Sequence, residues 1–406
     1  MEIKLVISIL ILVSRVNSLM EKDLHDKLFK TYNKNVIPAE NSSVPVNVQL
    51  GMTVRFIDDL NEKMQTISIS HYLTLTWKDA FLKWDPEKFD NATSINVEAV
   101  AIWRPDIVLD LSLGESNDLI GKEGNVIIYH TGKVTMWPHG IMKVPCKMDL
   151  TRFPFDEQSC SLEFYSWSYW MDKLNLTSMF PEPHIEKNIL SADWELVNGT
   201  VEQINGVFEE DVWCKVRINL HLRRKWLFAF LNTVVPILCI AMLNMLCFVL
   251  PCESGERLTM TMSLFLSLAV YMTIFSSTMP ETSDQAPVLG MYVAMQLLGS
   301  AITIAETVFS LYFYFKSGKV YVNQALIGFV RCQGVVKITS GESDESTTSI
   351  VSRNTETTQT RHGDGFPVYQ TVSGTDISHA IDRFFVIVFA LWNVSLMAVL
   401  FAHFFK

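Results

Sequence analysis

The chain has 406 residues, of which 49% are hydrophobic, and its formal net charge at pH 7 is −10. This acidic balance repels nucleic-acid phosphates, which excludes a nucleic-acid-binding role. The zinc-protease, nucleophile-elbow and P-loop motifs are absent from the sequence, so nothing favours an enzyme, a bound metal or a cofactor.

Residues 1–18 have the pattern of a secretory signal peptide. Lys4 supplies the positive start, residues 5–13 form an apolar core, and Ser18 ends a small-residue cleavage site. Cleavage there predicts that the following residues lie outside the cell.

Residues 19–224 are expected to form this extracellular domain, an all-β, immunoglobulin-like sandwich. A short polar helix is expected at 22–32. Turn clusters at residues 130–132 and at Asn205-Gly206 separate segments in which apolar and polar residues alternate, and several short strands at this spacing favour a sandwich. The expected strands are 46–57, 65–77, 124–136, 159–168 and 212–222.

Glycans and one disulfide are expected in the same domain. Cys146 and Cys160 are a plausible disulfide pair in an oxidising compartment, which leaves Cys214 as the odd external thiol. Four N-x-S/T sequons predict glycosylation at Asn41, Asn91, Asn175 and Asn198.

Four apolar stretches follow, each meeting the requirement of about 20 residues for a helix that crosses a bilayer. Four buried helices of a soluble protein are the alternative, but such helices keep a polar face. The stretches are 226–250, 258–279, 288–315 and 384–405. Residues 225–316 therefore hold three transmembrane helices, with a pore helix at 257–279, and residues 381–406 hold the fourth and a short extracellular C-terminus.

Residues 317–380 are expected to form a cytoplasmic loop, partly disordered where Ser, Thr and Glu dominate. Its basic residues, among them Arg331, Lys337, Arg353 and Arg361, agree with the positive-inside rule. This topology predicts a multi-pass protein of the plasma membrane, in contact with the lipid bilayer and with both termini outside.

The segment from Cys146 to Cys160 contains Phe-Pro-Phe-Asp, ending at Asp156, and resembles the defining loop of the Cys-loop receptor superfamily. Further matches are Trp103-Arg-Pro-Asp106, Ser166-Trp167-Ser168-Tyr169, Arg223-Arg224-Lys225, Pro236 and Met279-Pro280. Within that superfamily, the chain is most similar to nicotinic acetylcholine receptors. The resemblance implies a pentamer of identical or related subunits in which the second helix lines a central pore. It also implies gating by a small-molecule agonist, coupled through Phe153, Pro154, Phe155, Arg223 and Pro280.

The second span carries a periodic stripe whose members recur at spacings of three and four, on one helical face. Small hydroxyls there either pack helices together or line water. Glu256 at the cytoplasmic end favours water, since an intramembrane carboxylate needs solvent or a partner, and Leu266 and Val270 suit a hydrophobic gate. Five copies of Glu256 would favour cations. The stripe is Glu256, Thr259, Ser263, Leu266, Val270, Thr273 and Ser277.

The resemblance places the agonist between neighbouring subunits, in a cage of aromatic rings that attracts ammonium. One subunit is expected to supply Trp167, Trp213, Phe208, Tyr169 and Asp110, the last in place of a tyrosine. The neighbour is expected to supply Tyr72, Ile127, Thr135 and Trp137. Trp103 and Asp106 are expected in the core of the sandwich.

The adjacent cysteine pair of acetylcholine-binding subunits is missing. The pattern is instead similar to the cephalopod chemotactile receptors, so we expect a homopentameric chemosensory cation channel gated by hydrophobic or bulky amphipathic environmental molecules. The alternatives are a neuronal nicotinic acetylcholine receptor subunit, including a non-binding partner in a heteropentamer, and a membrane-anchored binding protein without a channel.

Overall fold

The computed structural model describes residues 22–41, 43–114, 124–186, 191–208, 211–281, 286–316, 319–322 and 370–404. By their contacts the residues form two units. The β unit comprises Met1–Asp149 and Phe155–Lys225, and the helical unit comprises Leu150–Pro154 and Trp226–Lys406. The predicted signal peptide lies outside the described residues.

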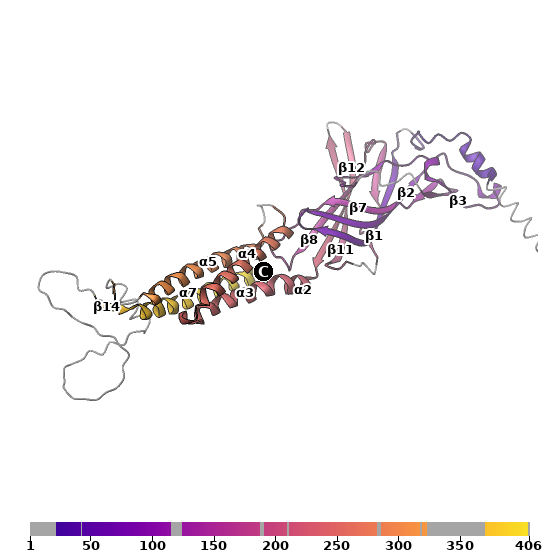
Figure 1. Ribbon diagram of the computed structural model, residues 1–406. Coiled ribbons are helices and arrows are strands. Elements are labelled where there is room, and N and C mark those ends of the chain that lie inside the picture. The colour runs from indigo at the N-terminus through magenta and orange to yellow at the C-terminus, as the bar shows by residue number, and fades with distance from the viewer. Residues whose placement is uncertain are drawn as a thin grey trace, which may run out of the picture. The chain divides into compact units, whose positions relative to one another are not determined.

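The β unit opens with a helix at residues 22–29, followed by two antiparallel-rich sheets that form the predicted sandwich. Sheet A runs β10-β1-β2-β6-β5-β3, with β7 also on β2 and β9 also on β1, and sheet B runs β11-β12-β8-β4. Figure 1 labels the longer strands of both sheets. The strands of sheet A are β1 Val46–Asn61, β2 Thr66–Lys78, β3 Ser94–Glu98, β5 Asn125–Tyr129, β6 Lys133–Met136, β7 His139–Pro145, β9 Leu174–Ser178 and β10 His184–Ile185. Those of sheet B are β4 Ile107–Leu109, β8 Glu157–Ser166, β11 Trp194–Phe208 and β12 Asp211–Arg224.

The core of the β unit follows from the alternation. Along β8 and β12, every second side chain is buried, as Leu162, Phe164, Val216 and Ile218 illustrate, while their neighbours reach water. Burying each such side chain contributes about 1.5–3 kcal/mol. Trp103 is also buried, as expected for a core residue. Its ring lies edge-on to that of Trp77, with the two ring centroids 6.1 Å apart.

Two strand predictions change in detail. The segment 124–136 is two strands, because the chain turns at Gly132 with φ +83. The turn predicted at Asn205-Gly206 is wrong, since both residues lie inside β11 and pair with Cys214 and Trp213 of β12. Gly206 has a packing role there, described below.

In its described part, the helical unit contains four helices long and apolar enough to cross a membrane, and they run side by side (Figure 1). The first, Trp226–Val249, joins α2 (Trp226–Ala229), a π-helical turn η3 (Phe230–Val234), α3 (Val235–Leu246) and η4 (Cys247–Val249). The wide turn precedes Pro236, whose missing N–H interrupts regular helical bonding. The others are α4 Arg257–Thr278, α5 Val288–Phe315 and α7 Gly374–Phe404.

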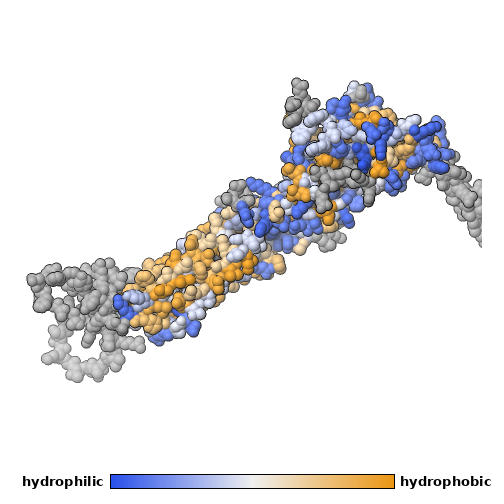
Figure 2. Space-filling view, turned by 45° about the horizontal axis from the view of Figure 1, so that its top comes forward, coloured by the Kyte–Doolittle hydropathy of each residue, from blue (hydrophilic) through white to orange (hydrophobic). Residues whose placement is uncertain are grey.

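The outer faces of these helices suit a lipid environment. Large apolar side chains such as Leu298, Phe309, Leu391 and Val394 are exposed in the single chain. The space-filling view shows a mostly apolar surface over this unit, in contrast to the mixed surface of the β unit (Figure 2). At 1.5 Å per residue, the 22 residues of α4 span roughly 33 Å, enough for the hydrocarbon layer.

The fourth helix begins earlier than predicted. Its first turns lie within the segment assigned to the cytoplasmic loop, next to a ribbon of β13 (Lys319–Val322) and β14 (Gln370–Ser373). The hydropathy pattern did not predict these turns, because polar side chains anchor them by hydrogen bonds to α5. Ser310 Oγ of α5 donates to Asp382 at 2.8 Å and lies 2.7 Å from Ser378 Oγ. The remainder of the predicted loop lies outside the described residues.

Two ion pairs of one arginine, Arg224, form a cluster at the end of β12. The Arg224 guanidinium donates to Asp156 at 2.7 and 3.1 Å and to Glu62 at 2.8 Å, and it lies 4.1 Å above the ring of Trp194. Burial alone would lower the pKa of Arg224, but Asp156 and Glu62 raise it. The neighbouring Arg223 pairs with Glu157 on the exposed side.

Replacing Asp156 by Asn should destabilise the protein by about 3 kcal/mol, because the buried guanidinium loses its bidentate partner. The measurement is the thermal unfolding midpoint of the purified full-length protein. Glu157→Gln is the matched control, since it breaks an exposed pair worth at most about 1 kcal/mol. Equal losses in the two variants would contradict this assignment.

Candidate functional site

The predicted principal half of the ligand site lies on sheet B. Trp167 follows β8 and is 72% exposed, Trp213 lies on β12, and Asp110 follows β4. The backbone of Phe208 ends β11, but its side chain lies outside the described residues. Trp167, Trp213 and Asp110 therefore share one sheet, around a residue that the sequence did not single out.

That residue is Tyr165. Its ring centroid lies 6.3 Å from that of Trp167 and 5.6 Å from that of Trp213, the latter edge-on. We call Tyr165, Trp167 and Trp213 the aromatic cage. The spacing could have revealed it, because side chains two residues apart on a strand share a face and Tyr165 precedes Trp167 by two.

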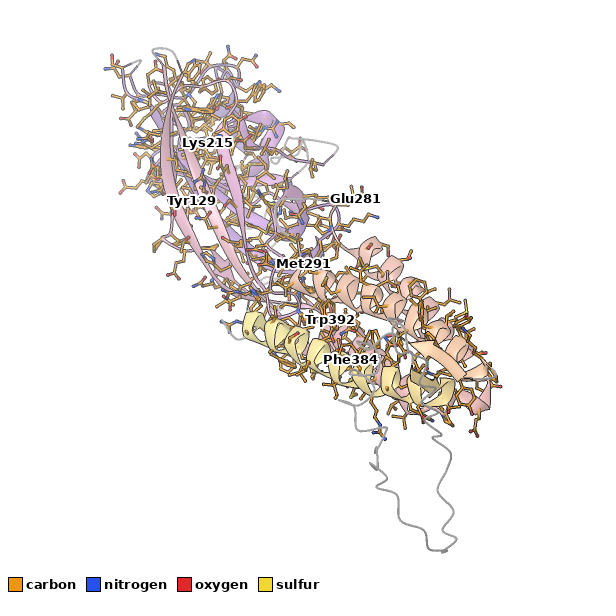
Figure 3. The ribbon with its side chains drawn as sticks, turned by 90° about the vertical axis from the view of Figure 1, so that its left-hand side faces the viewer. Tyr129, Lys215, Glu281, Met291, Phe384 and Trp392 are labelled. Carbon is orange, nitrogen blue, oxygen red and sulfur yellow. A yellow bond between two sulfur atoms is a disulfide. The ribbon has the colours of Figure 1, made fainter. Side chains whose placement is uncertain are left out.

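A lysine enters this cage from the same strand as Trp213. The Lys215 ammonium lies 4.5 Å from the Trp213 ring centroid and 4.9 Å from that of Tyr165. It donates to Asp110 at 2.5 Å and to Glu163 at 3.1 Å. Lys215 lies among the long strands of sheet B, where Figure 3 labels it.

The charges around Lys215 keep it protonated. Burial alone would lower the pKa of Lys215, but the hydrogen bonds that it donates to Asp110 and Glu163, together with their charges, outweigh that effect and raise it. Burial and the Asp110 charge likewise raise the pKa of the Tyr165 hydroxyl, so that ring stays neutral. Glu163 also accepts from Arg217 at 2.8 Å, which completes an alternating row of four charges.

Gly206 positions Trp213. The two residues are opposite one another in the ladder between β11 and β12, and any side chain at 206 would overlap the indole. The ring therefore lies against the backbone of β11, with its Nε1 buried and without a hydrogen-bond partner among the described residues. Glycine is needed at 206 because of this close approach.

The sheet-B half borders a cleft of about 790 Å³. Trp167, Ser168 and Tyr169 line it together with the segment 102–108. Asp106 shapes its wall by accepting hydrogen bonds from the Ser166 hydroxyl and, at 2.6 Å, from the Ser168 backbone N–H. Tyr169 packs on the buried Trp103, with ring centroids 6.3 Å apart.

The predicted complementary half lies on sheet A. Ile127 pairs with Thr135 across β5 and β6, and the Thr135 hydroxyl lies 3.4 Å from that of Thr76, whose strand also carries Tyr72. Directly opposed residues share a face, so Tyr72, Ile127 and Thr135 lie on the same side of sheet A. Trp137 follows β6 and is 42% exposed. The two halves therefore occupy different sheets of one chain.

All seven members of the predicted pore stripe are exposed along α4 or at its start. Leu266 is 64% exposed, while Thr261, Leu268 and Phe275 on other faces of α4 are buried. Met262 and Ile274 are exposed as well, so the stripe is part of a broader exposed surface of α4. The exposed stripe is Glu256, Thr259, Ser263, Leu266, Val270, Thr273 and Ser277.

Arg257 points away from the stripe. Its guanidinium is buried and pairs with Glu306 of α5 at 3.1 Å and with Asp382 of α7 at 2.9 Å. It also donates to Cys252 Sγ at 3.3 Å. The adjacent Glu256 is exposed, so neighbouring residues of opposite charge face different environments.

The disulfide between Cys146 and Cys160 is confirmed. Part of the enclosed loop, Leu150–Pro154, belongs to the helical unit. Phe153 is buried with its ring 6.4 Å from that of Phe275, and Val288 N–H donates to Thr151 O at 3.3 Å. The apolar tip of the loop thus contacts residues near the end of α4 and at the start of α5.

The other residues predicted to couple gating differ from one another. Pro154 is buried and Phe155 half-buried, while Pro280 follows α4. Arg223 is exposed, and Arg224 is the buried arginine. Alternation along β12 explains the difference, because adjacent side chains point to opposite faces of the sheet.

The four predicted glycosylation sites differ in how exposed they are, and the free thiol of the β unit, Cys214, is buried. Asn41, Asn91 and Asn198 are exposed. Asn175 is half-buried and its amide nitrogen, the glycan attachment atom, donates to Asn47 at 2.9 Å. Cys214 is buried, which raises its thiol pKa, and its Sγ accepts from Leu176 N–H at 3.0 Å.

Comparison with protein families finds two matches in tandem. The family model described as "Neurotransmitter-gated ion-channel ligand binding domain" matches residues 21–226. The one described as "Neurotransmitter-gated ion-channel transmembrane region" matches residues 233–370. These two matches cover most of the β unit and the first three helices.

Similar curated proteins are receptor subunits. The chain is 34% identical over 299 residues to acetylcholine receptor subunit alpha-type acr-16 of Caenorhabditis elegans, covering 73% of this chain and 59% of that protein. It is 32% identical over 301 residues to neuronal acetylcholine receptor subunit alpha-6 of Mus musculus, covering 73% of this chain and 60% of that one. The chain thus spans about three fifths of the length of these relatives.

The contact between Gly206 and Trp213 predicts a coupled effect on stability. Gly206→Ala should cost about 1–2 kcal/mol, because the added methyl group overlaps the indole. In a Trp213→Ala background the same change should be neutral or slightly stabilising, since alanine restricts the unfolded chain.

The measurement is a double-mutant cycle on thermal unfolding of the purified full-length protein. The two backgrounds should differ by at least about 1 kcal/mol in the effect of Gly206→Ala. The same effect in both backgrounds would show that glycine at 206 serves the backbone alone.

Proposed function

Because the chain belongs to the neurotransmitter-gated ion-channel family, we propose that it is a subunit of a pentameric, ligand-gated cation channel in the plasma membrane, with both termini outside the cell. The family is one of channels, not of enzymes. The stripe on α4 carries the proposal. A carboxylate and a row of hydroxyls exposed to lipid would be costly, whereas five copies around an axis would give them water.

Cation selectivity is assigned to Glu256. Its carboxylate is exposed, while the positive charge beside it, Arg257, is buried and balanced by Glu306 and Asp382. Five subunits would therefore present a ring of carboxylates that the adjacent arginines do not neutralise. Leu266 and Val270 are the exposed apolar members of the stripe and suit a gate that closes by dewetting.

Coupling between agonist and pore is assigned to the disulfide loop. Phe153 packs on Phe275 of α4, and the Thr151 carbonyl accepts a hydrogen bond from the Val288 N–H of α5. The loop therefore contacts two successive helices, α4 and α5. Pro154, Phe155, Arg223 and Pro280 are proposed members of the same pathway.

The agonist is assigned to the junction of two subunits, between the sheet-B half of one and the sheet-A half of the next. Trp167 and Trp137 are both exposed in the single chain, which leaves large apolar surfaces for a neighbour and a ligand. Asp110 stands where the nicotinic cage has a tyrosine, and it already binds Lys215. A hydrophobic or bulky amphipathic environmental molecule fits these features, so the proposed role is chemosensory.

A second candidate is favoured by the relatives, which are named as acetylcholine receptor subunits. In that case the chain would respond to acetylcholine, or would assemble with a partner subunit that does. Expression of the chain alone, with current recording, separates the candidates. Current evoked by hydrophobic compounds but not by acetylcholine supports the chemosensory role, and current evoked by micromolar acetylcholine contradicts it.

Glu256→Ala should reduce the preference for cations over anions, because the proposed ring loses its charge. The measurement is the reversal potential under a salt gradient. Glu253→Ala is the matched control, as it removes a nearby exposed carboxylate that is bonded to Tyr314 instead. Unchanged selectivity in Glu256→Ala would place the filter elsewhere.

Trp137→Ala should reduce the potency of bulky agonists by more than tenfold, about 1.4 kcal/mol, through lost contact area. Trp137→Phe should recover part of this loss. Concentration–response curves provide the measurement. Unchanged potency for every agonist would remove Trp137 from the site.

A further inference from the structure

The aromatic cage already contains a cation. The Lys215 ammonium lies 4.5 Å from the centroid of Trp213 and 4.9 Å from that of Tyr165, within the 6 Å at which a ring face attracts positive charge. The lysine side chain is only 13% exposed. Two of the three rings of the cage, Tyr165 and Trp213, are thus engaged by a group of the same chain.

The charge of this lysine is fully balanced. Asp110 and Glu163 both accept from Lys215, and Glu163 also pairs with Arg217 at 2.6 Å. Two cations and two carboxylates alternate along the row, so it is neutral without any ligand. An anionic ligand would have to displace a carboxylate, and a second ammonium would meet the repulsion of Lys215.

We propose that Lys215 is the resident cation of the aromatic cage, and that the ligand of this site is therefore a neutral, apolar molecule rather than an ammonium. The inference rests on the proposed function only in taking the cage as part of the agonist site. Trp167 supports it, because its ring is 72% exposed and offers apolar area beside the filled part of the cage.

The test compares two probes of nearly equal shape. Choline carries a quaternary ammonium, and 3,3-dimethylbutan-1-ol replaces its nitrogen by carbon. Binding of each to the purified full-length pentamer is measured by titration calorimetry, which does not require the channel to open. Failure of the proposed channel activity is therefore distinguishable from failure of this inference.

The wild-type protein should bind choline no more tightly than the neutral alcohol. Lys215→Met should reverse this preference to at least tenfold in favour of choline, because two ring faces and the Asp110 carboxylate become available. Arg217→Met is the matched control: it removes the same charge from the same row but leaves Lys215 over the rings. Its preference should match that of the wild type.

A Lys215→Met protein that does not fold is replaced by Lys215→Met with Asp110→Asn, which keeps the Glu163–Arg217 pair and removes the unpaired carboxylate. Preference for choline in this double variant also supports the inference. Three results overturn it: a tenfold preference for choline in the wild type, an equal shift in Lys215→Met and Arg217→Met, or no preference for choline once Lys215 is removed.

Discussion

A cation withdrawn from water needs opposite charge within hydrogen-bond distance, and three positions among the described residues meet that need in the same way. Arg224 at the end of β12 has Asp156 and Glu62, Arg257 at the start of α4 has Glu306 and Asp382, and Lys215 in the cage has Asp110 and Glu163. Each cation is held by two carboxylates that lie in or next to different strands or helices. Each cluster therefore fixes how those elements meet.

The consequences differ between the units. In the helical unit, the pairing turns Arg257 inward and leaves Glu256 as the charge on the exposed stripe of α4. In the β unit, the pairing brings Lys215 against Trp213 and Tyr165. Two rings of a cage suited to an ammonium ligand therefore already bind the ammonium of a lysine from the same chain. The same requirement thus supports a cation pathway in one unit and disfavours a cationic agonist in the other.

The sequence predicted the elements whose signals are periodic or compositional. Alternation identified β1, β2, β8 and β12, hydropathy identified the four long helices, and the Cys146–Cys160 loop identified the superfamily. Local signals failed where a distant partner decides the outcome. Gly206 has the local signal of a turn residue, but its glycine is needed because Trp213 packs against it. The first turns of α7 have the composition of a loop, but Ser378 and Asp382 form hydrogen bonds with Ser310 of α5.

The candidate site was predictable in part for the same reason. The resemblance directed attention to Trp167, Trp213 and Asp110, all of which lie on sheet B. The resemblance gave no reason to choose Lys215. The strand alternation predicts only that Lys215 and Trp213 share a face of the sheet. It does not show that the Lys215 ammonium lies over the rings, where it binds Asp110. The sheet-A residues lie on the other sheet of the same chain, so their place in the site rests on the proposed assembly.

The most direct test is a high-resolution structure of the assembled protein with an activating compound bound. The account predicts five chains with the stripe of α4 facing a central axis. It also predicts a neutral agonist between Trp167 of one subunit and Trp137 of the next, with Lys215 still over Trp213 and Tyr165. An agonist ammonium in the place of the Lys215 ammonium, with the lysine displaced, would contradict it.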